Sequence, residues 1–142
     1  LQNAKMTDVY SREKRSEIMS RVRNKKTGAE DSVAATLRQL KIRFKQNVSS
    51  LPGKPDFVVN KYKTVVFVNG CFWHGHSGCK RGKLPTSNIS FWQKKIGQNK
   101  KRDRANIRLL RQQGWRVFVV WQCKIVNIKK LKQHLSMINN GL

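Results

Sequence analysis

The chain has 142 residues, which is enough for one domain with a hydrophobic core and too few for two. It carries 31 Lys and Arg against 7 Asp and Glu, and this net charge of +24 predicts a polyanionic partner. The hydrophobic content of 38%, arranged in periodic blocks, argues against a disordered basic tail. No run of about 18 apolar residues occurs, so we expect no membrane-spanning segment.

The three cysteines predict a reducing environment, because an odd number does not make a disulfide framework. We therefore expect a cytoplasmic protein whose thiolates bind a metal. Met6 is a candidate start residue, and Leu1 to Lys5 are then expected to be upstream or vector-derived sequence. No signal-peptide pattern precedes Met6.

Two helices are predicted at the start of the chain. A basic segment with apolar Ile18, Met19 and Val22 predicts a helix over residues 11–24. Thr27-Gly28-Ala29-Glu30 has the pattern of a capping box, which predicts a second helix over residues 28–41. We therefore divide the chain into a basic N-terminal helical arm, residues 1–27, and a single domain, residues 28–142.

The rest of the chain alternates between strands and helices. The expected elements are a strand over 43–48, a loop over 51–55, a strand over 56–59, a hairpin turn over 60–63, a strand over 64–68, a helix over 91–113, a strand over 115–121 and a helix over 128–138. Ser90 is the expected N-cap of the long helix, and Gly114 is expected to end it. Because that helix connects strands 64–68 and 115–121, these two strands should be parallel.

The segment from Cys71 to Cys79 has the composition of a metal-binding loop. Cys71, His76 and Cys79 are three candidate zinc ligands, and zinc requires a fourth, either His74 or Cys123. Cys71 and Cys123 each follow one of the two parallel strands, so both thiols should emerge at the same edge of the sheet. This geometry favours Cys123, although a buried cysteine with no metal is the alternative reading.

Asp56 is the candidate catalytic carboxylate. Pro55-Asp56 stands where a loop enters a strand, and a carboxylate there can hold Mg²⁺, although Pro-Asp is also a common turn pair. Pro-Asp before an apolar strand resembles the restriction-endonuclease-like nucleases, but their usual acid-x-Lys triplet is missing from residues 65–70. Another group must then accept the proton, and His74 is the nearest titratable side chain.

The aromatic residues divide into two groups. Phe72 and Trp73 lie in a glycine-flanked polar loop followed by Lys80 and Arg81, which predicts stacking on nucleic-acid bases; the alternative is a place in the core. Trp115 and Trp121 lie in or beside an apolar strand and are expected in the core.

Two further polar residues are expected to have no catalytic role. Asp103 is the only acid on the basic long helix, whose cations are expected to form a solvated face that partly contacts phosphates. We expect Asp103 to pair with a neighbouring Arg or Lys. His134 is expected to be a solvated helix residue.

Several spaced motifs together resemble the very-short-patch repair (Vsr) mismatch endonucleases. The resemblance extends in order from about Ser11 to Cys123. It is carried by Leu51-Pro52-Gly53-Lys54-Pro55-Asp56-Phe57-Val58-Val59, Gly70-Cys71-Phe72-Trp73-His74, Phe91-Trp92-Gln93-Lys94-Lys95-Ile96-Gly97, Arg102-Asp103, Gly114-Trp115-Arg116-Val117 and Trp121-Gln122-Cys123.

This resemblance implies an α/β fold with a restriction-endonuclease-like core, in which helices flank a mixed central sheet. It implies a Mg²⁺-dependent endonuclease that nicks one DNA strand 5′ of the T in a T:G mismatch, such as arises from deamination of 5-methylcytosine. It also implies a structural zinc bound by Cys71, His76, Cys79 and Cys123. The partner would be double-stranded DNA, and the protein would be a monomer associated with the nucleoid.

The resemblance also assigns individual roles. Asp56 matches the catalytic metal ligand, the backbone carbonyl of Val68 also reaches the metal, and His74 matches the catalytic histidine. Glu30 matches an acid near the active site, but it also fills the capping-box position. Phe72, Trp73 and Trp92 match aromatics that wedge into the base stack, and Met19 matches a residue that enters from the other groove.

Asn69 departs from the family pattern, which has a second histidine there. Asn cannot carry a proton at neutral pH, so we expect a lower rate or a shifted pH optimum. Two rival hypotheses remain open: a related endonuclease that cuts unmismatched DNA, and a zinc-stabilised DNA-binding module without activity.

Overall fold

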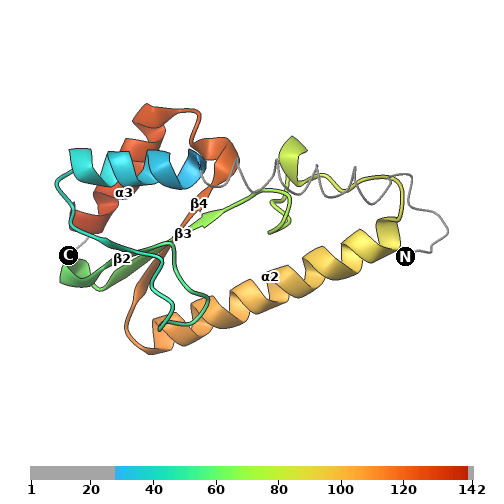
Figure 1. Cartoon of the computed structure of the whole chain (residues 1–142), viewed down its shortest axis with the longest axis horizontal. Helices are drawn as coiled ribbons and strands as arrows, with labels where there is room; N and C mark the ends of the chain where they lie inside the picture. The colour runs from blue at the N-terminus through green and yellow to red at the C-terminus, as the bar shows by residue number, and fades with distance from the viewer. Residues whose placement is uncertain (1–27, 141–142) are drawn as a thin grey trace.

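The computed structural model describes residues 28–140, and residues 1–27 and 141–142 lie outside the described part (Figure 1). The predicted arm, its helix over 11–24, Met19 and Thr27 of the capping box therefore fall outside it. The elements in chain order are a helix over residues 28–39, β1 (Lys45–Gln46), β2 (Phe57–Val59), η1 (Asn60–Tyr62), β3 (Thr64–Asn69), η2 (Lys80–Gly82), α2 (Ile89–Gln112), β4 (Arg116–Trp121), η3 (Gln122–Lys124) and α3 (Ile128–Asn140).

The described residues form one mixed four-stranded sheet in the order β1-β2-β3-β4. β1 pairs with β2 and β2 with β3 in antiparallel orientation, and the predicted turn between β2 and β3 is present as η1. β3 pairs with β4 in parallel over six residues, from Thr64 opposite Arg116 to Asn69 opposite Trp121. The predicted parallel pairing across the long helix is thereby confirmed.

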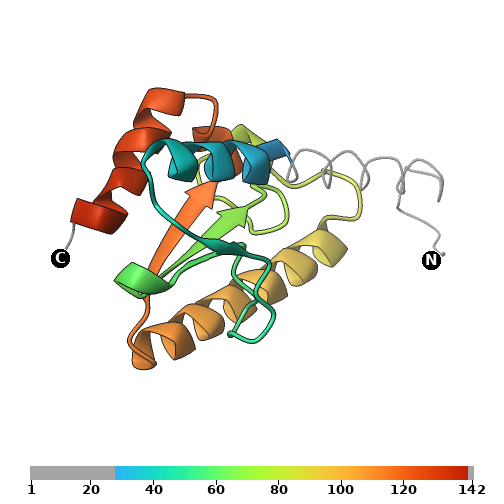
Figure 2. The ribbon, with the colours of Figure 1, turned by 60° about the vertical axis from the view of Figure 1, so that its left-hand side comes forward.

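Helices cover both faces of this sheet, as Figures 1 and 2 show. On one face, buried residues of the helix over 28–39 and of α3 pack with Phe57, Val66, Val68 and Val120. On the other face, Leu110 of α2 packs against Val58 and Val65. Because side chains alternate along a strand, consecutive residues of β3 serve opposite cores, which explains its nearly continuous apolar sequence.

The long helix begins earlier than its sequence indicated. α2 starts at Ile89 after Asn88, which has a left-handed backbone (φ 56°) and makes no side-chain capping hydrogen bond, so the predicted Ser90 cap is wrong. Asn tolerates the left-handed region better than most residues. The N-terminal half of α2 extends past the sheet alongside the loop that follows β3 (Figure 1).

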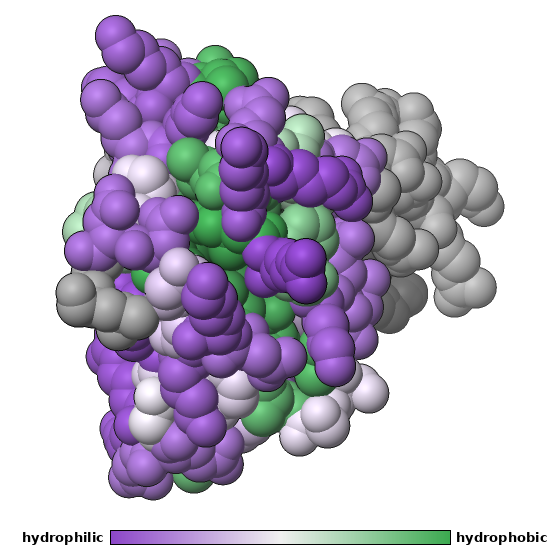
Figure 3. Space-filling view, turned by 90° about the vertical axis from the view of Figure 1, so that its left-hand side faces the viewer, coloured by the Kyte–Doolittle hydropathy of each residue, from purple (hydrophilic) through white to green (hydrophobic). Residues whose placement is uncertain are grey.

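The face of the described part that Figure 3 shows is mostly hydrophilic. Figure 3, which faces the end of the molecule where β2 turns into β3, shows hydrophilic side chains around a smaller hydrophobic area. Arg38, Lys41 and Arg43 line a shallow hollow there with Ile42 and Phe44. None of the helices within residues 28–140 has the length and apolar character needed to span a bilayer.

Leu110 should be essential for holding α2 against the sheet. We expect Leu110→Ala to lower the free energy of unfolding by about 2–5 kcal/mol, because this side chain is fully buried. Leu109→Ala is the matched control, since Leu109 is 46% exposed and should change stability by less than about 1 kcal/mol. Urea denaturation followed by circular dichroism measures both, and equal losses would contradict this packing.

Candidate active site and metal centre

Three thiols and one imidazole gather at the edge of the sheet where β3 and β4 end. The ligand atoms of Cys71, His76, Cys79 and Cys123 all lie within 4.8 Å of one another. Cys71 follows β3 by two residues, and Cys123 follows β4 by two residues, so the parallel register brings them to the same edge. Cys123 is a member of this group, whereas His74 is not.

The spacing within the group suits a tetrahedral ion. The Sγ of Cys123 lies 3.4 Å from Nδ1 of His76, and the backbone N–H of Cys123 donates to Sγ of Cys71 at 3.4 Å. A zinc ion with bonds of about 2.3 Å to sulfur and 2.0 Å to nitrogen holds those two atom types roughly 3.5 Å apart. The donor set of soft thiolates and an imidazole is the one that zinc prefers.

The two loop thiols differ in acidity. Burial raises the pKa of the Cys71 thiol to about 12, so its thiolate form needs a nearby cation. Burial acts in the same direction on Cys79, but backbone hydrogen bonds from Arg81 and Gly82 and the Cys123 side chain outweigh it and lower the pKa. Burial and then Lys124 lower the pKa of His76, which favours the neutral imidazole that binds metals.

Trp121 packs against the candidate metal-binding group, which consists of Cys71, His76, Cys79 and Cys123. Its ring stacks on the His76 imidazole with centroids 4.1 Å apart and planes 6° apart. The prediction that Trp121 belongs to the core is therefore wrong, because the side chain lies at the sheet edge and is only half-buried. Trp115 does pack against the core cluster of Val58, Val65 and Leu110, as expected.

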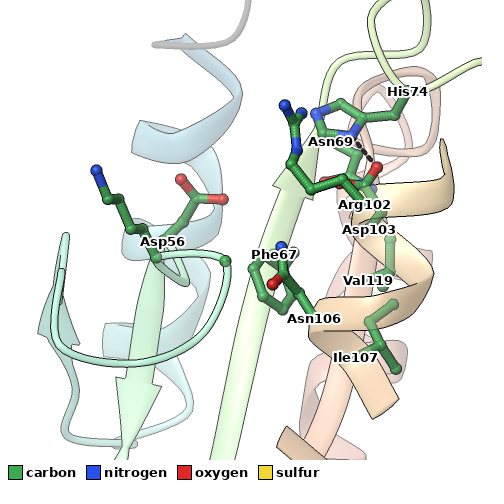
Figure 4. A pocket seen from close by; sticks show the side chains of 11 residues that line it. Asp56, Phe67, Asn69, His74, Arg102, Asp103, Asn106, Ile107 and Val119 are labelled. Atoms are coloured by element: carbon green, nitrogen blue, oxygen red, sulfur yellow. Dashed lines mark hydrogen bonds and ion pairs between the residues drawn. The ribbon is translucent and has the colours of Figure 1, made fainter. Parts of the chain in front are cut away.

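A cavity of about 440 Å³ lies between the sheet and α2, next to the metal-binding group. Its lining combines Asp56, Asn69 and His74 with Asp103 and Arg102 of α2. Figure 4 shows the Asp56 carboxylate on one side of this cavity and the His74–Asp103 pair on the other. Three candidate catalytic residues that are separated in sequence thus face one space.

Asp56 is fixed by the neighbouring strand. It is 9% exposed, and its Oδ2 accepts a hydrogen bond of 2.7 Å from the backbone N–H of Val68. The loop before it crosses α2 closely at Gly53, where a Cβ would lie 3.1 Å from Asn106 and where φ is +75°. Gly53 therefore permits the approach that brings Asp56 to the cavity.

His74 is hydrogen-bonded to Asp103. Its Nδ1 lies 2.5 Å from Oδ2 of Asp103, and the two side chains are 17% and 24% exposed. The prediction that Asp103 pairs with a local Arg or Lys is wrong, because Asp103 faces the sheet from α2 rather than solvent. His134 is exposed, as predicted, although its ring also lies against Phe118.

Two cations at the cavity were missed by sequence reasoning. Lys54 and Arg102 line it beside Asp56 and His74. Both lie in motifs that carry the family resemblance, but a motif does not show where a side chain points. Glu30 lies half-buried on the helix over 28–39 and is not among the residues that line the cavity.

Phe72, Trp73 and Trp92 form one aromatic cluster at the N-terminal end of α2. Their ring centroids lie 5.2–6.1 Å apart in edge-to-face contacts, and all three are only partly buried. Phe91, which is 49% exposed, extends the cluster and was also missed; the repeated Phe-Trp pair was its signal. Asn99 donates a 2.9 Å hydrogen bond to the Trp73 carbonyl and so holds the loop on α2.

Lys80 and Arg81 lie on η2, beside the metal-binding group, and are exposed. Asn69 is 8% exposed and lines the cavity, whereas the Val68 side chain is buried in the core on the opposite face.

Comparison with known proteins gives a consistent result. The family model described as DNA mismatch endonuclease Vsr matches residues 7–81. The Type II nicking enzyme V.XorIIP of Xanthomonas oryzae pv. oryzae is 43% identical over 133 residues, 94% of this chain and 97% of that relative. DNA mismatch endonuclease Vsr of Escherichia coli (strain K12) is 41% identical over 126 residues, 89% of this chain and 80% of that relative.

Cys123 should be required for metal retention, and His74 should not. We expect Cys123→Ser to lose bound zinc during dialysis against a weak chelator, while His74→Ala keeps one equivalent, because only Cys123 lies within the group. Elemental analysis of the dialysed proteins measures this. If Cys123→Ser retained its zinc and His74→Ala lost it, the fourth ligand would be His74 and not Cys123.

Proposed function

Because the chain belongs to the Vsr family of DNA mismatch endonucleases, we propose that it nicks one strand of duplex DNA 5′ of the T in a T:G mismatch. Its family makes it a DNA-nicking hydrolase. The mismatch specificity, the use of Mg²⁺ and a role in repair of deaminated 5-methylcytosine are our proposals. The main support is one cavity that joins Asp56 to the His74–Asp103 pair, beside a cluster of aromatic rings.

The architecture is compatible with this activity. We take the mixed sheet, with helices on both faces, to be a restriction-endonuclease-like core, and residues 28–142 to be a single endonuclease domain. The basic residues 1–27 would form a separate arm on the DNA, and the protein would act as a monomer. The metal-binding group would hold a structural zinc, because four protein ligands leave no open position for catalysis.

Asp56 is the residue best suited to hold the catalytic Mg²⁺. Mg²⁺ is commonly bound through one or two carboxylates, with waters and substrate phosphates completing its shell. The N–H and C=O of a strand residue point to the same side, so the Val68 carbonyl should face Asp56 as its N–H does. The bound ion would polarise the phosphate and activate water.

His74 can act as the proton acceptor, and Asp103 fixes its orientation. A carboxylate only accepts hydrogen bonds, so Nδ1 must carry the proton that is shared with Asp103. Nε2 then has the lone pair that takes a proton from the attacking water, and Asp103 stabilises the resulting imidazolium. Asn69 can hydrogen-bond the water or the phosphate but cannot replace His74 as a base.

Lys54 and Arg102 supply the positive charge that a scissile phosphate requires. Both line the cavity with Asp56, and negative charge develops on the phosphate oxygens during hydrolysis. The inactive DNA-binding module has no need for this combination of carboxylate, base and cations in one cavity. The catalytic reading therefore accounts for more of the structure.

The aromatic cluster suits detection of a mismatch. A T:G wobble pair is weakly stacked, so parting it from its neighbour costs less than parting a matched step. Stacking of an aromatic ring on an exposed base returns about 1–3 kcal/mol. Phe72, Trp73 and Trp92 are half-buried, and Trp73 directly precedes His74, which lines the cavity. The rings can therefore enter the base stack close to the scissile phosphate.

The wild-type protein with Mg²⁺ should nick a labelled duplex that holds a T:G mismatch in a CT(A/T)GG-like context, 5′ of the T. It should leave the fully paired duplex intact, and Asp56→Ala should lower the nicking rate by at least about 10³-fold, since the hydrated metal would lose its carboxylate. Denaturing gel electrophoresis measures both. Equal cutting of the paired duplex would support the rival hypothesis of an endonuclease that cuts unmismatched DNA. Full activity of Asp56→Ala would contradict the assignment of Asp56 as the Mg²⁺ ligand.

Asp103→Asn should slow nicking about 10–100-fold, because an amide cannot hold the His74 tautomer or stabilise the imidazolium as a carboxylate does. Binding of the mismatched duplex should stay within about twofold of wild type, because the change conserves shape. Single-turnover rates and fluorescence anisotropy separate these effects. Asp31→Asn, at an exposed position on another helix, is the matched control and should be neutral.

A further inference from the structure

Gly97 lies in the middle of α2, where glycine weakens a helix. It costs roughly 1 kcal/mol relative to Ala at such a position. No contact within the described residues requires it, since a Cβ built on Gly97 meets nothing within 4 Å. Gly75 provides the contrast, because a Cβ there would lie 2.6 Å from Ile96 and φ is +59°. Gly75 is thus explained by packing within the chain, and Gly97 is not.

An open groove lies beside Gly97, between α2 and the metal-binding loop. Its wall on α2 consists of Gln93, Ile96, Gly97 and Lys100, which share one stripe of the helix at i, i+3, i+4 and i+7. The opposite wall is the loop with Lys80 and Lys83. The stripe lies about a quarter turn around α2 from Asn99 and Asp103. The groove and the active-site cavity share no lining residue.

Three lysines, Lys80, Lys83 and Lys100, line this groove together with Gly97, and we call it the lysine groove. None of the three forms an ion pair with any residue in the described range 28–140. The groove begins beside the aromatic cluster, since Gln93 follows Trp92 and Gly75 comes two residues after Trp73. A chain of phosphates bound in the groove would therefore extend from the place where the aromatic rings contact the bases.

We propose that the lysine groove binds the phosphodiester backbone of one DNA strand next to the mismatch, and that Gly97 allows that backbone to approach α2. This inference rests on the proposed function, in which the partner is duplex DNA. A side chain at position 97 would project into the groove and hold the backbone away from Lys100. The helix thus loses local stability where the substrate needs space.

Substitutions at Gly97 test this proposal, because stability and binding should move in opposite directions. Gly97→Ala and Gly97→Leu should both raise the melting temperature, since Ala and Leu are strong helix formers. Their Kd for a mismatched duplex should rise, about threefold for Ala and tenfold or more for Leu, in the order of side-chain size. Gln98→Leu is the matched control at the next, exposed position, which does not line the groove, and its Kd should match wild type.

The lysines provide an independent measurement. The logarithm of the DNA-binding constant should fall less steeply with the logarithm of salt concentration in Lys100→Ala, by about 0.9 for one lost phosphate contact. Lys132→Ala on α3, on the opposite side of the sheet, should keep the wild-type slope.

Unchanged DNA binding in Gly97→Leu, or an unchanged salt slope in Lys100→Ala, would overturn the proposal. Binding of paired duplex is measured in parallel, so failure of the groove is distinguishable from failure of mismatch nicking. A protein that binds DNA through the groove but nicks no T:G duplex would refute only the proposed function.

Discussion

The parallel pairing of β3 and β4 is the constraint on which the rest of the structure depends. Its register places Asn69 opposite Trp121, so the chain leaves both strands at the same edge and in the same direction. Cys71 and Cys123 each lie two residues beyond that last pair, and this equal spacing allows one metal ion to bind both. The position of the candidate site is set by this edge, because the loop that starts there also carries Phe72, Trp73 and His74.

α2 is the second determinant, because one stripe of this helix, spaced at i, i+4 and i+11, contacts the sheet, the loop and His74. Leu110 anchors its C-terminal half to the sheet, and Asn99 and Asp103 hold the loop and His74 at its centre. Asp103 is the single acid among the eight Lys and Arg of this helix. Although cations are its neighbours along the helix, Asp103 is hydrogen-bonded to the His74 imidazole across the cavity wall.

Sequence patterns predicted what local periodicity and chain connectivity determine. The β-branched run of 64–68, the long helix and the next apolar strand imply a parallel pair, and hence the joint position of Cys71 and Cys123. The His74–Asp103 pair could not be predicted, because it joins residues 29 apart through the rotation of α2, which no pattern fixes to within one face. Trp121 was misassigned for a related reason: apolar sequence predicts burial but does not separate a core position from the end of a strand, where a ring can stack on His76.

In the proposed function, the loop after β3 would connect base stacking to bond cleavage through two adjacent residues, Trp73 and His74. Asn99 holds the carbonyl of Trp73, and Asp103, one turn later on α2, holds the ring of His74. If the aromatic cluster inserts into DNA as proposed, it would act on the same short segment that orients the His74 ring. In the proposed mechanism Asn69 cannot act as a proton acceptor, so catalysis would depend on the placement of His74. In such a site, a duplex that does not admit the aromatic rings would also leave the His74 imidazole misaligned. Mismatch recognition and strand cleavage would then depend on the same geometry.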